Sequence, residues 1–120
     1  MKREYTDLDV WQKSRVLVRL VYTLTINFPK EELFGLTNQI RRCTVSIPSN
    51  IAEGCGRNTS KDTCHFLFIA RGSLYELETQ LYLACDLNYL PEQKLQELLA
   101  AILECKKLLN GFINYFQTLN

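Results

Sequence analysis

The side chains suited to nucleophilic and acid–base chemistry are few and poorly spaced in this chain of 120 residues. Its one histidine, His65, directly follows Cys64, and helical neighbours point about 100° apart, so the two cannot form a local catalytic pair. Glu53 with Glu76 or Glu78 offers a carboxylate pair, but no Glu-x-x-His motif of a bundle metal site accompanies it. We therefore expect no enzyme, no metal site and no cofactor.

Basic side chains near the middle of the chain are better candidates for a binding surface. The formal net charge is only +1, yet residues 39–71 are basic and the stretch after them is acidic. Arginine and lysine at helix ends contact phosphates, and we predict that nucleic acid binds here. The residues predicted to contact it are Arg41, Arg42, Arg57, Lys61 and Arg71. Solvated helix faces with balanced charge explain the same pattern without a ligand.

Polar residues also lie beside the apolar positions in the middle of the chain. They are Ser46, Ser49, Asn50, Glu53, Ser73 and Glu76. Pro48 stands among them, and a proline inside a helix has no N–H to donate to the carbonyl of Thr44. Because hydroxyls and an amide lie within about one turn, we predict a kinked helix repaired by a structural polar network. A pocket lined by these residues is the functional alternative.

Apolar residues spaced by three and four predict four helices and an all-α fold. The helices cover about residues 9–27, a segment that starts between 30 and 36 and ends at 54, about 59–88, and the chain after Pro91. The third has a seam of Leu67, Ala70, Leu74, Leu77, Leu81 and Ala84, and the fourth a seam of Leu95, Leu98, Ile102, Cys105, Leu109, Phe112 and Phe116. Short connections favour an up-down-up-down antiparallel four-helix bundle, as one domain over residues 1–120.

An aromatic stripe lies beside the seam of the third helix. Phe68, Tyr75, Tyr82 and Tyr89 are spaced seven apart and follow the leucine row by one residue. Aromatic residues with polar tips suit subunit interfaces, so the stripe is a candidate oligomer interface. It is equally consistent with the margin of a wide core.

The cysteines and the hydropathy suggest where the protein works. The five cysteines contain no CxxC pair, which is typical of free thiols in a reducing compartment. The first residues have no apolar segment, and no apolar run approaches the roughly 18 residues of a membrane span. We expect a cytoplasmic protein with no membrane contact.

Several strings of the sequence resemble a known family. "DLDVWQKS", "IPSNIAEG" and the run from Gly72 to Leu81 are similar to the small four-helix-bundle proteins of the 23S rRNA intervening sequence, the S23-like ribosomal proteins. The match extends through Gln39–Arg42, Ser46–Gly54 and Arg57. The resemblance implies a bacterial, non-enzymatic bundle that assembles as a ring-like homopentamer. A relative encoded with diversity-generating retroelements binds nucleic acid and a reverse transcriptase.

The leading expectation is a non-catalytic homo-oligomer, a pentamer by the resemblance, that binds structured rRNA or DNA through a basic surface. A scaffold that binds a protein partner, such as a reverse transcriptase, is the alternative from another class. The acidic second half and the aromatic stripe are its candidate surface.

Overall fold

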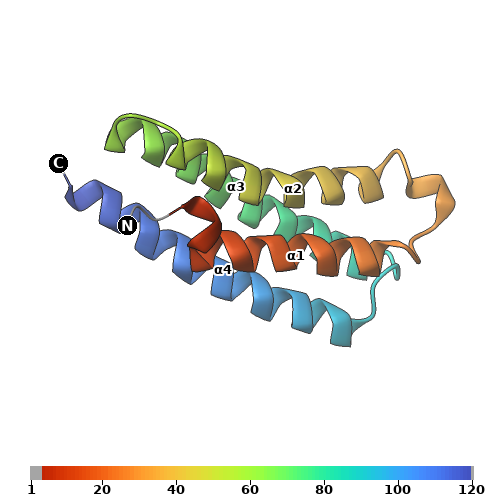
Figure 1. Ribbon diagram of the computed structural model, residues 1–120. Helices are drawn as coiled ribbons and strands as arrows, with labels where there is room; N and C mark the ends of the chain where they lie inside the picture. The colour runs from red at the N-terminus through yellow and green to blue at the C-terminus, as the bar shows by residue number, and fades with distance from the viewer. Residues whose placement is uncertain (1–3, 120) are drawn as a thin grey trace.

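Four long helices make up most of the protein in the computed structural model, which describes residues 4–119 (Figure 1). They are α1 (Asp9–Thr25), α2 (Leu36–Cys55), α3 (Ser60–Asp86) and α4 (Glu92–Thr118). Two short 3-10 helices, η1 (Tyr5–Asp7) and η2 (Lys30–Glu32), precede α1 and α2. No strand occurs in the described residues, so the predicted all-α fold is confirmed. Residues 1–3 and 120 of the predicted domain lie outside the described part.

Successive helices run in opposite directions and form the predicted up-down-up-down bundle (Figure 1). The bundle measures 46 × 25 × 23 Å, and its closest helix pair is α2 with α3. The N-terminus, the α2–α3 turn and the C-terminus lie at one end, while η2 and the α3–α4 turn lie at the other (Figure 1). Within residues 4–119, no helix is both long enough and apolar enough to cross a bilayer.

The core consists of the predicted apolar seams. All six residues predicted for the third helix are buried, and so are Leu95 to Leu109 of the α4 seam. The prediction is wrong at the end of α4, where Ile113 is buried and Phe112 and Phe116 are only half-buried. An α-helix has 3.6 residues per turn, so a strict alternation of three and four drifts off the buried face over about six turns.

The helix ends differ from the predicted ones by a few residues. The hydroxyl of Thr59 accepts a hydrogen bond from the Asp62 N–H at 3.1 Å and caps α3. The helix ends at Asp86 because Asn88 takes a left-handed conformation (φ 64°), which asparagine tolerates well. The N–H of Tyr89 then bonds the carbonyl of Ala84 at 2.9 Å, which closes the turn.

The end of α2 lies very close to α3. The Thr63 hydroxyl donates to the carbonyl of Gly54 at 2.8 Å, and both residues are buried. A Cβ on Gly54 would lie 3.0 Å from the Thr63 carbonyl oxygen and 3.2 Å from Cβ of Phe66. Glycine therefore sets the distance between the two helices at this end of the bundle.

Candidate nucleic-acid interface

The five basic residues predicted to contact nucleic acid do not form one patch. Arg41 and Arg42 lie in the second turn of α2, whereas Arg57 and Lys61 lie at the α2–α3 turn. With a rise of 1.5 Å per residue, Arg42 is about 20 Å from the end of α2. Arg71 lies on α3 and turns toward α4, where it bonds the side chain of Asn110. The prediction treated these five residues as one surface, but the fold places them in three separate regions.

Arg41 lies across α1. Its Nε donates to the hydroxyl of Thr25 at 2.8 Å, and its guanidinium carbon is 4.7 Å from the centre of the Tyr22 ring. These contacts fix the side chain in the groove between the two helices. Cation–π contacts of this kind leave the edge of the guanidinium able to donate hydrogen bonds.

Arg57 and Arg71 already have partners within the protein. Arg57 pairs with Glu53 at 3.3 Å and lies 4.4 Å from the centre of the Phe66 ring. Arg71 donates to Asn110 Oδ1 at 3.2 Å and lies over Phe68. The Glu53 carboxylate offsets the charge of Arg57, which weakens the attraction between Arg57 and a phosphate. Lys61 and Arg42 are exposed and have no ion-pair partner among residues 4–119.

A second candidate basic surface lies on α1 and α2, and only two of its four arginines were predicted from the sequence. Its members are Arg15 and Arg19 of α1 with Arg41 and Arg42 of α2. The two α1 arginines line one surface hollow of about 440 Å³ with Gln12 and Val16. We call these four arginines the α1–α2 basic face. The spacing of four between the α1 arginines was the signal available in the sequence.

Aromatic and apolar surface lies between these arginines. Arg15 is 5.1 Å from the centre of the Trp11 ring, and it lines a second hollow of about 340 Å³ with Trp11, Val45 and Pro48. Guanidinium groups bind phosphates, and exposed ring faces and proline offer stacking surface for bases. This combination suits single-stranded or looped nucleic acid better than isolated surface lysines would.

The polar residues of α2 and α3 divide into an interhelical cluster and a solvent-facing set. Ser46 and Ser73 share a short hydrogen bond between their hydroxyls, and the Cys43 thiol donates to the Ser73 carbonyl at 3.1 Å. The amide of Asn50 donates to the Ser46 carbonyl at 2.8 Å. Ser49 and Glu53 are exposed and take no part. The predicted network therefore exists for part of its members only.

Two further details of this region depart from the prediction. The helix continues through Pro48, but none of the described side chains donates to the Thr44 carbonyl, so the predicted repair is wrong. Glu76 is exposed; it accepts a bond from Gln80 at 3.4 Å and lies beside Cys43.

Burial, and then the Glu76 carboxylate, raise the pKa of the Cys43 thiol to about 12. Burial also raises the pKa of Cys105, to about 11, so both thiols stay protonated at neutral pH.

The aromatic stripe of α3 is exposed except at its end. Phe68, Tyr75 and Tyr82 are 40%, 52% and 48% exposed. Tyr89 lies outside α3; its hydroxyl donates to Glu32 at 2.8 Å and its ring packs 5.7 Å from Phe28. Tyr89 therefore closes the end of the bundle. Further exposed apolar residues lie beside the stripe and at the C-cap of α3, and together they form the α3 outer face: Phe68, Ile69, Tyr75, Tyr82, Leu83 and Leu87.

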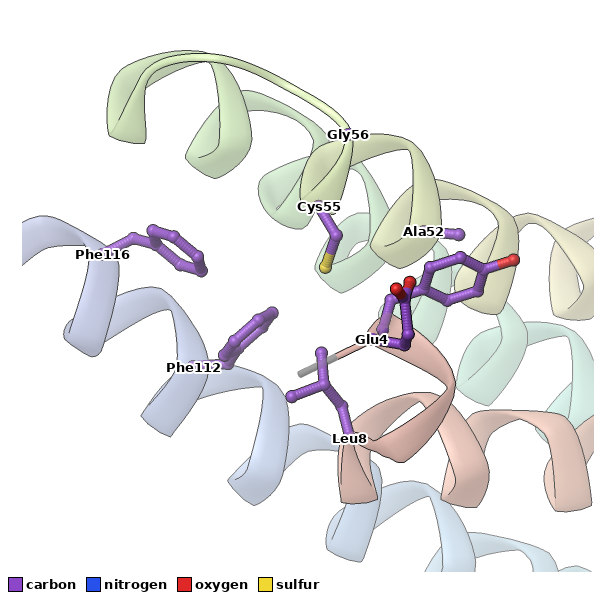
Figure 2. A pocket seen from close by; sticks show the side chains of 8 residues that line it. Glu4, Leu8, Ala52, Cys55, Gly56, Phe112 and Phe116 are labelled. Atoms are coloured by element: carbon purple, nitrogen blue, oxygen red, sulfur yellow. The ribbon is translucent and has the colours of Figure 1, made fainter. Parts of the chain in front are cut away.

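A cavity of about 490 Å³ opens at the end of the bundle that holds both termini (Figure 2). Leu8, Cys55, Phe112 and Phe116 make most of its wall, with Glu4 at one side (Figure 2). Burial raises the pKa of the Cys55 thiol, so this thiol is uncharged at neutral pH. Among the described residues, no three metal-binding side chains come together here or elsewhere.

Comparison with known proteins identifies relatives of this bundle. The family model described as 23S rRNA-intervening sequence protein matches residues 6–111. A crystal structure of a protein of unknown function from the S23 ribosomal protein family, from Bacteroides thetaiotaomicron, is 27% identical. It superposes with a TM-score of 0.79, over 88% of this chain and 95% of that one. A comparison with curated proteins gave no match.

Proposed function

Because the chain belongs to the family of 23S rRNA-intervening sequence proteins, we propose that it binds structured RNA or DNA without catalysing a reaction. The surface that binds is the α1–α2 basic face, with Arg41 and Arg42 from the predicted set and Arg15 and Arg19 from α1. Arg57, Lys61 and Arg71 are secondary contacts, since two of them are engaged within the protein. The family description supports a role connected with RNA.

The observation that carries this proposal is the contact of Arg15 with the Trp11 ring and of Arg41 with the Tyr22 ring, two arginine–aromatic pairs on adjacent helices. A protein that neutralises Z phosphates loses affinity with salt at a log–log slope of about −0.9Z on duplex DNA and about −0.7Z on single strands. Four arginines in contact with phosphates correspond to a slope of roughly −3 to −4 per subunit. Such binding is weak in one copy and strong only at low salt.

We also infer that the protein is a homo-oligomer, a pentamer by its family resemblance, in which copies meet through the α3 outer face. Five large apolar side chains exposed on α3, with Leu87 at its C-cap, support this inference, because large exposed apolar patches mark interaction surfaces. A ring multiplies the basic faces available to one nucleic acid. The gain is in effective concentration, with no new contact required.

The test is a salt titration of binding to 23S rRNA fragments and to duplex DNA, read by fluorescence anisotropy. The double variant Arg15→Gln with Arg19→Gln should reduce the magnitude of the slope by about 1 to 2 per subunit and weaken binding to all sequences alike. Lys94→Gln with Lys107→Gln is the matched control, because it removes two positive charges from exposed positions of α4. Absence of binding even at low salt would refute the proposal.

A scaffold that binds a protein partner is the second candidate, and the α3 outer face is the observation that favours it. A partner protein, such as a reverse transcriptase, would cover the same apolar residues that a second copy would cover. Purification of a complex with one defined protein, unchanged by nuclease treatment, would favour the scaffold over nucleic-acid binding.

A further inference from the structure

A small cavity lies at the end of the bundle where α1 leads through η2 into α2. Its volume is about 110 Å³, and its polar wall is made by Thr25, Lys30, Thr37 and Arg41. A water molecule occupies about 30 Å³ in the liquid, whereas sites for drug-sized molecules start at about 300 Å³. The cavity therefore suits a group of a few heavy atoms.

Thr37, which lines this cavity, has a hydroxyl that needs explanation. Thr37 is only 2% exposed, and its Oγ1 has no hydrogen-bond partner. Thr25 and Thr44 solve the same problem by donating to the carbonyl four residues earlier, at 2.8 and 2.7 Å. Thr37 is the second residue of α2, so the residue four positions earlier lies before the helix. A buried hydroxyl left unpaired costs about 1–3 kcal/mol, which a ligand that accepts its proton would recover.

Positive charge borders the same space. The bond from Arg41 Nε to Thr25 holds the guanidinium at the cavity, and its terminal nitrogens have no partner among residues 4–119. Lys30 is exposed at the rim. Thr37 stands in the first turn of α2, where the helix dipole and the free N–H groups favour an anion.

The carboxylates of Glu31 and Glu32 lie outside the lining of the cavity. Oε1 of Glu32 accepts from the Leu36 N–H at 3.2 Å, and Oε2 accepts from the Tyr89 hydroxyl at 2.8 Å. Both oxygens are thus engaged, and Glu32 does not line the cavity. Glu31 is exposed to solvent.

We propose that this cavity binds a phosphate group. The Thr37 hydroxyl donates to one phosphate oxygen, the terminal nitrogens of Arg41 donate to others, and Lys30 adds charge at the rim. Free phosphate and the phosphate of a nucleic-acid backbone share this chemistry. The inference therefore goes beyond the proposed function, because it does not require that nucleic acid binds. The site would exist even if no nucleic acid bound to the basic face.

The experiment titrates the full chain with inorganic phosphate and, at matched ionic strength, with chloride, while amide NMR shifts are recorded. Phosphate should shift the amides of Thr37 and Asn38 and the Nε–H of Arg41, and chloride should not. Thr37→Val keeps the shape and removes the hydroxyl, so phosphate affinity should fall by about tenfold. Thr79→Val, on the exposed side of α3, should leave the affinity unchanged.

A second variant, Arg41→Gln, keeps the proposal testable if Thr37→Val changes the fold. No shift with phosphate in the natural protein, or equal affinity in all variants, would overturn the site. If phosphate displaces bound RNA from the natural protein but not from Thr37→Val, the site takes a backbone phosphate. If phosphate binds to the natural protein without displacing RNA, the site takes free phosphate. If the natural protein binds phosphate but no RNA, only the proposed function is refuted.

Discussion

Replacing Gly54 with alanine should destabilise the protein, although the same change inside a helix normally stabilises it. Alanine exceeds glycine in helix propensity by about 0.8–1 kcal/mol. The new Cβ would lie 3.0 Å from the Thr63 carbonyl oxygen and 3.2 Å from the Cβ of Phe66. One atom belongs to the α3 backbone and the other is bonded directly to it, so neither can rotate away as the tip of a side chain could. Overpacking of a well-packed contact costs about 1–3 kcal/mol, so the net loss is about 1 kcal/mol.

Gly111→Ala is the matched control for this prediction. Gly111 is also inside a helix, and no atom lies within 4 Å of a Cβ built there, so the change should stabilise the protein by up to about 1 kcal/mol. The two variants should therefore differ by about 2 kcal/mol, or by roughly 8 °C in Tm for a domain of this size. Urea denaturation followed by circular dichroism measures the difference. All samples need one protein concentration, because the stability of an oligomer depends on it. If Gly54→Ala is as stable as Gly111→Ala, α3 moves to accommodate the new Cβ at little cost. The prediction of overpacking would then be refuted.

Two further outcomes are expected. Tyr75→Ala combined with Tyr82→Ala should lower the mass measured by light scattering, because it removes two exposed rings from the α3 outer face. The free energy of unfolding should fall as the pH rises from about 9 toward 11, because the pKa of Cys43 is raised to about 12 and that of Cys105 to about 11. In that range the unfolded chain releases protons that the folded chain keeps, at about 1.4 kcal/mol per pH unit for each thiol.

Each of these outcomes has its own control. Tyr115→Ala removes an exposed ring from α4 and should leave the mass unchanged. An unchanged mass in the α3 double variant would return the aromatic stripe to the margin of the core. Replacing Cys43 and Cys105 with alanine should remove the loss of stability that the two thiols cause in this range. A pH dependence equally steep in that variant would assign it to other groups.

The helices were predictable because burial follows a period that the sequence records directly. Leu67, Leu74 and Leu81 are buried as their spacing required. The start of α2 was less certain, since Lys30–Glu32 form a separate 3-10 turn before Leu36. Their spacing alone does not distinguish that turn from the first turn of a longer helix.

The site was harder to predict because charges close in sequence separate in space. Arg41 and Arg42 are neighbours, yet they point about 100° apart, one over α1 and one into solvent. Arg15 meets Val45 and Pro48 of α2 only because α1 packs against α2, which no local pattern records. The unpaired hydroxyl of Thr37 depends likewise on where the helix begins.

The bond between Ser46 and Ser73 bears on how the chain finds a single arrangement. Leucines at 67, 74 and 81 repeat every seven residues, so sliding α3 along α2 by seven residues would present much the same apolar seam. A slide in one direction would bring Phe66 opposite Ser46 and leave its hydroxyl unpaired, and a slide in the other direction would replace Ser73 with the longer side chain of Gln80. One polar pair thus makes the alternative alignments unequal in energy, as a buried asparagine does in a coiled coil. Its main contribution is to fix the alignment of the two helices, while the leucines supply most of the cohesion between them.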